Sequence, residues 1–240
     1  MKLIEKIKNK EAIVGVVGLG YVGLPMAVAV ARKGYDVVGF DVSEYAVTHV
    51  NAGDNYIGDV DDAELKQLVD AGKLKATFDY AEAKAADIIM IAVPTPLDKY
   101  QQPDSSYVRA SVKSLSENVS PDTLVILEST TYPGTTAEIV VPAFEEKGFE
   151  IGKDFFVSFS PERVDPGNQD YKTRNTPKVV GGVTDKCNEI SKIFYEHILE
   201  ASIHTVSSPA IAEMEKIYEN TFRNINIALA NEMTILCNRM

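Results

Sequence analysis

The sequence predicts an α/β fold in which a doubly wound, mostly parallel sheet is followed by a long C-terminal helix. Strand-like and helix-like segments alternate along the 240 residues, as right-handed βαβ crossovers require. Two of the strand-like segments, "ADIIMIAVP" and "TLVILES", are unbroken apolar runs, which is typical of parallel strands covered on both faces. The end of the chain instead carries apolar side chains at steps of three and four, the pattern of an amphipathic helix.

Each predicted strand is a short apolar run bounded by polar or turn-forming residues. In chain order, the strands are expected at 12–18, 35–41, 86–94, 123–129, 154–161, 177–182 and 202–206. The predicted helices are amphipathic or lie between two such runs. In chain order, they are expected within 1–12 and at about 22–33, 44–51, 61–71, 105–118, 134–147 and 184–199. The stripe of the final helix comprises Ile211, Met214, Tyr218, Phe222, Ile225, Leu229, Met233, Leu236 and Met240.

Composition excludes several classes of function. The chain has 24 basic and 35 acidic residues, a net charge of −11, and no Lys/Arg block, so a nucleic-acid surface is not expected. Two cysteines make no disulfide framework and no CxxC metal spacing occurs, so we expect no metal site and a reduced, cytoplasmic setting. No segment approaches the roughly 20 apolar residues of a membrane span.

A glycine motif points to a dinucleotide. Gly18, Gly20 and Gly23 form G-x-G-x-x-G between the first predicted strand and the helix behind it. In a Rossmann-like unit the first glycine permits the tight turn, the second lets the backbone approach a pyrophosphate, and the third allows close helix–strand packing. The helix N-terminus adds free N–H groups for the phosphates. Asp41 closes the second strand, where a carboxylate meets the adenosine ribose.

The same aspartate predicts which cofactor binds. A carboxylate accepts hydrogen bonds from a ribose diol but repels a 2′-phosphate, and the "DVSEYA" segment that begins at Asp41 contains no Arg or Lys. The sequence therefore predicts NAD over NADP.

Other strand ends carry polar side chains, and ligands of such sheets sit outside these ends. Thr95 follows one strand and Thr130 another, although ordinary turn chemistry explains hydroxyls there equally well. Glu162 follows a third strand, where a carboxylate can act as a base or hold a water; a surface Glu–Arg pair is the competing reading. Lys216 and Asn220 share one face of the final helix, either to stabilise an oxyanion or as part of a solvated face.

Six motifs occur in this order: "GLGYVGLP", "NAGDNYIGDV", "VPTP", "ESTTYPGTT", "SPER" and "AEMEKIYENTFRNINIALANE". Together they resemble the UDP-glucose/GDP-mannose dehydrogenase family, over nearly the whole chain from about Ala12. "SPERVDPG" and "ESTTYPGTT" are most similar to the branch that oxidises UDP-N-acetylhexosamines. The resemblance implies an NAD-dependent nucleotide-sugar 6-dehydrogenase, which oxidises the C6 alcohol of a UDP-N-acetylhexosamine or UDP-glucose twice, through an aldehyde, to the uronic acid.

The resemblance also implies roles for individual residues. The cofactor site would comprise Gly18, Gly20, Tyr21, Val22, Gly23, Asp41, Pro94, Thr95 and Thr130. Thr130 would in addition help to position a catalytic water. Substrate would contact Glu162, Arg163, Lys216, Asn220 and Arg223. Among these, Glu162 would serve acid/base chemistry or water activation, and Lys216 with Asn220 would stabilise the oxyanion at C6.

The sequence departs from the family pattern at two positions. Ala46 stands where a basic residue often follows the ribose-binding aspartate, which weakens the expected hold on the cofactor. Pro166 stands where UDP-glucose enzymes tend to have a second glutamate, which argues against a two-glutamate mechanism.

The nucleophilic cysteine of the family lies in a Gly-rich loop beyond the long helix, and no such loop occurs in this sequence. Cys237 falls inside the helix and is expected to be a packing residue. On this resemblance, residues 1–206 are the NAD-binding domain and 207–240 begin the central connecting helix, ahead of a dimerising middle region and a second Rossmann-like domain. Such an exposed stripe predicts a homodimer through the helix.

Two other classes of function remain open from the sequence. A β-hydroxyacid dehydrogenase also joins a G-x-G-x-x-G domain to a helix with a Lys/Asn pair, although "ESTTYPGTT" and "SPER" do not belong to its pattern. A non-catalytic NAD-binding module is the other class. Oxidation of UDP-sugars, of hydroxyacids or of neither would distinguish the three.

Overall fold

A sheet of eight strands, in the order β3-β2-β1-β4-β5-β6-β7-β8, forms the centre of the computed structural model, which describes residues 2–164 and 172–240. All neighbouring strands are parallel except β6 and β7, which are antiparallel. The strands are β1 (Ile13–Val17), β2 (Asp36–Phe40), β3 (Leu74–Thr77), β4 (Ile88–Ile91), β5 (Thr123–Leu127), β6 (Phe155–Phe159), β7 (Lys178–Gly182) and β8 (Ile203–Val206). The predicted doubly wound sheet is confirmed.

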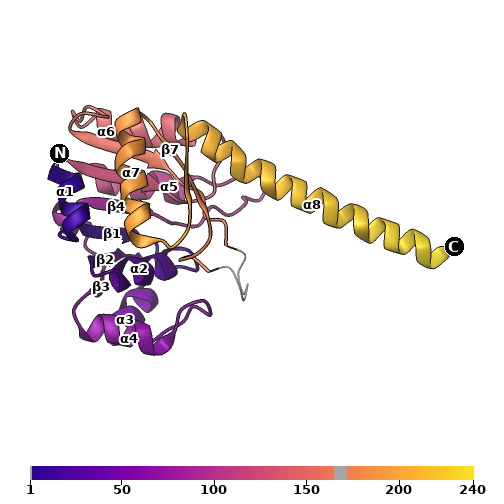
Figure 1. Cartoon of the computed structure of the whole chain (residues 1–240), viewed down its shortest axis with the longest axis horizontal. Coiled ribbons are helices and arrows are strands. Elements are labelled where there is room, and N and C mark those ends of the chain that lie inside the picture. The colour runs from indigo at the N-terminus through magenta and orange to yellow at the C-terminus, as the bar shows by residue number, and fades with distance from the viewer. Residues whose placement is uncertain (1, 165–171) are drawn as a thin grey trace.

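Helices cover both faces of the sheet (Figure 1). On one face, α1 (Lys2–Asn9), α2 (Gly23–Arg32) and α7 (Asp185–Ile198) bury their apolar sides in one core. On the other face, α5 (Ser106–Ser116), a π-helix (Thr136–Val140) and α6 (Val141–Glu145) form the second core. Near the β3 edge, α3 (Glu44–Ala52) packs against β3, and α4 (Asp62–Asp70) packs against α2 and α3.

The strand order places a ligand site. The chain leaves β1 for α2 on one face and leaves β4 for α5 on the other, so β1 and β4 flank the point where the winding reverses. The crevice at the carboxyl ends of two such strands is where open α/β sheets bind ligands.

One local prediction differs from the structure, and two short elements were not predicted. β3 lies at the sheet edge, and only two of its four side chains are buried, so no apolar run in the sequence marks it. The other element is a 3₁₀ turn (Tyr80–Ala85). The single helix expected at 134–147 is a π-helix that passes into α6. Pro142 explains the change, because it has no N–H for the i−4 carbonyl and its ring clashes there.

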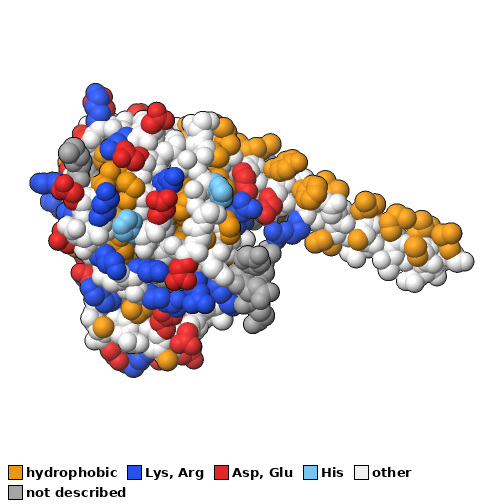
Figure 2. All heavy atoms as spheres, in the orientation of Figure 1, with side chains coloured by type: hydrophobic (Ala, Val, Ile, Leu, Met, Phe, Trp, Pro, Cys, Tyr) orange, Lys and Arg blue, Asp and Glu red, His pale blue; other side chains and the backbone are white. Residues whose placement is uncertain are grey.

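The last helix, α8 (Pro209–Arg239), leaves the sheet after its first turns (Figure 1). Pro209, Ala212 and Glu213 are buried against the domain, whereas every residue from 224 onward is exposed. With 31 residues the helix is roughly 46 Å long at 1.5 Å per residue. Its predicted apolar stripe is uncovered in the structure (Figure 2). No helix among the described residues has both the length and the apolar character needed to cross a bilayer.

Candidate cofactor and catalytic site

The glycine turn after β1 has the geometry that a bound dinucleotide needs. Gly18 has φ +89°, in the left-handed region that favours glycine. A Cβ at Gly23 would lie only 1.7 Å from the carbonyl oxygen of Gly18, so α2 can approach β1 only because residue 23 is glycine. A Cβ at Gly20 would meet nothing within 4 Å, which leaves this backbone open to a ligand. Tyr21 is exposed and Val22 is partly buried beside it.

Asp41 lies against this turn. Its carboxylate accepts hydrogen bonds from the backbone N–H of Leu19 (2.7 Å) and of Ser43 (2.8 Å). The hydroxyl of Tyr56 donates to the Leu19 carbonyl (2.7 Å) from the other side, and burial, with the nearby Asp41 carboxylate, raises the pKa of Tyr56. These contacts fix the half-buried carboxylate of Asp41 at the end of β2. Its remaining lone pairs are free to accept hydrogen bonds from ribose hydroxyls. Ala46 is buried in α3, so no cation stands there.

The loops after β4 and β5 lie side by side. The Ser129 hydroxyl donates to the Val93 carbonyl (2.8 Å) and so joins the two loops. Thr95 is half-buried, and Thr130 is exposed at the same edge as the glycine turn. The structure thus brings the predicted Pro94, Thr95 and Thr130 to one end of the sheet, open to a ligand.

Glu162, after β6, turns its carboxylate back onto its own loop. One oxygen accepts the N–H groups of Arg163 (2.7 Å) and Val164 (2.8 Å), and the other lies 3.3 Å from Lys178 Nζ. Burial would raise the pKa of Glu162, but Lys178 and the two N–H groups outweigh it and lower the pKa. Glu162 is therefore ionised at neutral pH and suits holding a water better than storing a proton.

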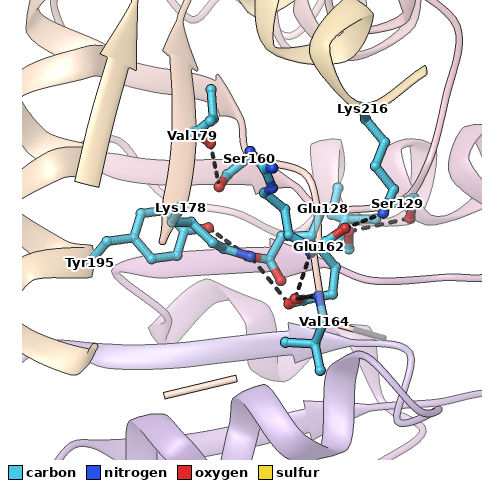
Figure 3. A network of polar contacts seen from close by, with 11 residues as sticks. Glu128, Ser129, Ser160, Glu162, Val164, Lys178, Val179, Tyr195 and Lys216 are labelled. Carbon is cyan, nitrogen blue, oxygen red and sulfur yellow. Dashed lines mark hydrogen bonds and ion pairs between the residues drawn. The ribbon is translucent and has the colours of Figure 1, made fainter. Parts of the chain in front are cut away.

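Behind Glu162 lies a buried group that sequence reasoning missed (Figure 3). Lys178 Nζ is 2.8 Å from Glu128, and the Tyr195 hydroxyl donates to the same Glu128 oxygen (2.6 Å). Burial would lower the pKa of Lys178, but Glu128 and Glu162 together raise it. Burial raises the pKa of Glu128. The signal in the sequence was weak: a charged residue at one end of each of two apolar strand runs.

Lys216 reaches from the second turn of α8 to residues 160–164 after β6, which we call the Glu162 loop. Its ammonium donates to the backbone carbonyl of Glu162 (Figure 3). Burial lowers the pKa of Lys216, and Glu162 and Glu219 partly oppose that shift. Asn220 lies one turn farther along α8 and is exposed. The predicted Lys216 and Glu162 are therefore brought together at the edge of the sheet that carries Thr130.

The two predicted substrate-binding arginines have protein partners. The Arg163 guanidinium pairs with Glu215 and with Glu219 (2.8 Å) of α8, and Arg223 lies 3.7 Å from Glu219. Glu213, fully buried, accepts the N–H groups of residues 134 (2.6 Å) and 136 (2.8 Å) at the start of the π-helix. These contacts fix the direction in which α8 leaves the domain.

Pro166, the predicted departure from the family pattern, lies outside the described residues. In the described part of the chain, no group of three or more His, Cys, Asp and Glu side chains could hold a metal ion. Cys187 is buried, whereas Cys237, expected to pack, is exposed on α8 because the distal part of that helix is uncovered.

Comparison with known proteins identifies this arrangement. Residues 12–199 match the sequence model of the UDP-glucose/GDP-mannose dehydrogenase family, NAD binding domain. The UDP-N-acetyl-D-glucosamine 6-dehydrogenase of Pseudomonas aeruginosa is 39% identical over 96% of this chain and 54% of its own length. Protein CapL of Staphylococcus aureus is 40% identical over 95% of this chain and 53% of its own. The chain thus spans about half the length of the curated relatives it matches.

Solved structures agree. The UDP-D-ManNAc dehydrogenase of Pyrococcus horikoshii superposes with a TM-score of 0.88 at 37% identity, over 93% of this chain and 53% of that one. A 3-hydroxyisobutyrate dehydrogenase of Mycobacterium tuberculosis has a TM-score of 0.65 at 18% identity and covers 91% of this chain and 63% of that one, which shows a shared fold alone. The chain belongs to the UDP-glucose/GDP-mannose dehydrogenase family and carries its NAD-binding domain.

Proposed function

We propose that the chain is the cofactor-binding half of an NAD-dependent nucleotide-sugar 6-dehydrogenase, which oxidises the C6 alcohol of a UDP-N-acetylhexosamine to the uronic acid by two hydride transfers. The observation that carries this proposal is the meeting of Lys216 with the Glu162 loop at the edge of the sheet that also carries the glycine turn. Relatives over the same region are named for UDP-N-acetyl-D-glucosamine and UDP-N-acetyl-D-mannosamine.

The residues of this chain fit the cofactor. The open backbone at Gly20 and the N-terminus of α2 would hold the pyrophosphate, and Asp41 the ribose. Tyr21, Val22, Pro94, Thr95 and Thr130 would line the remainder. NAD supplies the acceptor for the hydride that leaves C6.

On the substrate side, charge develops on the C6 oxygen as the hydride departs. The Lys216 ammonium and the Asn220 amide, on one face of α8, would donate hydrogen bonds to that oxygen. Glu162 and Thr130 would hold the water needed for the acid product. Arg163 and Arg223, which pair with glutamates of α8, would contribute to substrate binding. The central helix, in this proposal, begins at about residue 207, and the thiol of the second step belongs to a following region.

An assay of NADH absorbance tests this function. The intact enzyme is expected to produce two NADH per UDP-N-acetylhexosamine and none with a panel of β-hydroxyacids. This chain alone is expected to bind NAD without completing that oxidation, because Cys187 is buried against Val157 of β6 and Cys237 lies near the far end of α8. Oxidation of hydroxyacids would favour the β-hydroxyacid class. Cofactor binding by an intact protein that turns over neither substrate would favour a non-catalytic module.

Asp41 leads to a prediction about cofactor choice. NAD should bind this chain at least tenfold more tightly than NADP, because the carboxylate at the end of β2 would repel a 2′-phosphate, at a cost of about 1.4 kcal/mol or more. Titration of the chain with both dinucleotides measures this. Asp41→Asn is the matched variant, and it should narrow the difference between the affinities for NAD and NADP. Equal affinities for the two dinucleotides in the unchanged chain would contradict the prediction.

The exposed stripe of α8 leads to a prediction about assembly. We propose a homodimer through this helix, because a long uncovered apolar face normally finds a partner and a two-fold pairing of identical helices is the simplest. Sedimentation should show a dimer whose population rises with concentration. Leu229→Glu on the stripe should abolish it, whereas Asn231→Glu, on the opposite face, should not. A strict monomer from micromolar to millimolar concentration would refute the pairing.

The setting follows from the reaction. Free nucleotide sugars and NAD meet in the cytoplasm, and uronic acids of this kind are building blocks of polysaccharides. We therefore assign the proposed enzyme to the cytoplasm and to polysaccharide biosynthesis.

A further inference from the structure

A buried ion cluster lies behind the Glu162 loop, and the proposed reaction uses only one of its members, Glu162. We call it the Lys178 cluster; it consists of Glu128, Glu162, Lys178 and Tyr195 (Figure 3). The members come from the end of β5, the loop after β6, the start of β7 and α7. The Lys178 side chain is 3% exposed and that of Glu128 is 0% exposed.

Stability alone does not account for such a cluster. Removing charges from water is costly, and apolar replacements of buried ion pairs are often neutral or stabilising. Here the compensation is incomplete, because one carboxylate oxygen of Glu128 has no hydrogen-bond partner in the described structure. One positive charge also serves two carboxylates. The cluster is therefore better explained by the position that it imposes on a neighbour.

That neighbour is the Glu162 loop, which is held through Glu162 itself. Lys178 holds one oxygen of the Glu162 carboxylate, and the other oxygen accepts the N–H groups of Arg163 and Val164. The backbone carbonyl of Glu162 accepts a hydrogen bond from the Lys216 ammonium. One end of the loop is fixed independently, because the Ser160 hydroxyl donates to the Val179 carbonyl (2.8 Å).

We propose that Lys178 is a positioning residue for nucleotide-sugar oxidation: it holds the carboxylate of Glu162, so that the carbonyl of Glu162 holds the Lys216 ammonium where the C6 oxygen reacts. This inference rests on the proposed function for the role of Lys216. The Lys178 side chain is buried, so it would act on the reaction through two successive contacts and not by touching the substrate.

Two variants separate positioning from charge balance. Lys178→Met keeps the length of the side chain but leaves two buried carboxylates without a counter-charge, so it should lower stability as well as activity. Lys178→Met/Glu128→Gln also removes one negative charge and so restores the net charge of the cluster, without restoring the contact to Glu162. Stability should then recover, while kcat of the intact enzyme stays about 10–10²-fold low, because small misplacements of catalytic groups have effects of this size.

Controls make the comparison specific. Lys192→Met removes an exposed lysine of α7 that lies 3.8 Å from Glu196, and it should change neither stability nor kcat. Lys178→Arg keeps the charge and should regain part of the lost kcat. The KM for NAD should be unchanged in every variant, because the glycine turn and Asp41 lie outside the cluster.

Hydrogen exchange in this chain reports on the loop directly. The amides of Arg163 and Val164 should exchange faster in both Lys178→Met variants and at the wild-type rate in Lys192→Met. Recovery of kcat together with stability in the double variant would overturn the inference. Wild-type exchange rates at the amides of Arg163 and Val164 in the Lys178→Met variants would overturn it too. A wild-type intact enzyme that does not oxidise nucleotide sugars would instead overturn the proposed function, and with it the catalytic role of Lys178.

Discussion

Replacing Lys216 by alanine is expected to lower kcat of the intact enzyme by about 10²–10³, the usual effect of removing one oxyanion stabiliser. The ammonium is half-buried, where its attraction to developing negative charge is stronger than in water. Its contact with the Glu162 carbonyl holds it at the carboxyl edge of the sheet. NAD affinity should change little, because the proposed cofactor contacts, at the glycine turn and Asp41, do not involve Lys216.

The measurement compares turnover and NAD affinity for Lys216→Ala and, as a control, Lys192→Ala on α7. Burial lowers the pKa of Lys216, so the charged form is lost at lower pH than for an ordinary lysine. The wild-type kcat should therefore fall on the alkaline side, as pH rises through that lowered pKa, and the alanine variant should lack this fall. Near-normal turnover in Lys216→Ala would make Lys216 a structural residue of the α8 junction.

Most of the fold could be predicted because its signals are local. Buried parallel strands need continuous apolar runs, and β4 and β5 have them in full. β3 gives only two buried side chains, so its place beside β2 depends on contacts with distant residues. The antiparallel pairing of β6 with β7 is likewise a long-range choice that no segment encodes by itself.

The candidate site likewise has a part that local sequence signals predict and a part that they do not. Gly18, Gly20, Gly23 and Asp41 could be found from spacing, because the glycine turn and the strand ends belong to one βαβ unit. The grouping of Glu128, Lys178 and Tyr195 behind Glu162 could not be predicted, because these three residues belong to separate parts of the chain, at the end of β5, in β7 and in α7, and each alone resembles an ordinary polar residue. Arg163 was expected to face substrate, and only the structure reveals its pairing with Glu215 and Glu219.

Of two alanine substitutions in the glycine turn, one should strongly destabilise the fold and the other should leave its stability nearly unchanged. Gly23→Ala would place a methyl group 1.7 Å from the Gly18 carbonyl oxygen and 3.3 Å from Val16. The carbonyl belongs to the tight turn between β1 and α2, and nine of the ten residues of α2 are buried, so neither can move freely. Overpacking usually costs about 1–3 kcal/mol, and a clash with backbone should reach or exceed that upper value, out of a total stability on the order of 5–15 kcal/mol.

Gly20→Ala is the matched control, because its methyl group would meet nothing within 4 Å of the protein. Its stability should stay within about 0.5 kcal/mol of wild type. NAD affinity should nevertheless fall at least tenfold, because the new methyl group would occupy the space through which we propose that the pyrophosphate approaches the backbone. Urea unfolding and NAD titration of both variants separate the two effects. A Gly23→Ala chain as stable as wild type would show that α2 does not pack on β1 as described, and a Gly20→Ala chain with full NAD affinity would show that the pyrophosphate lies elsewhere.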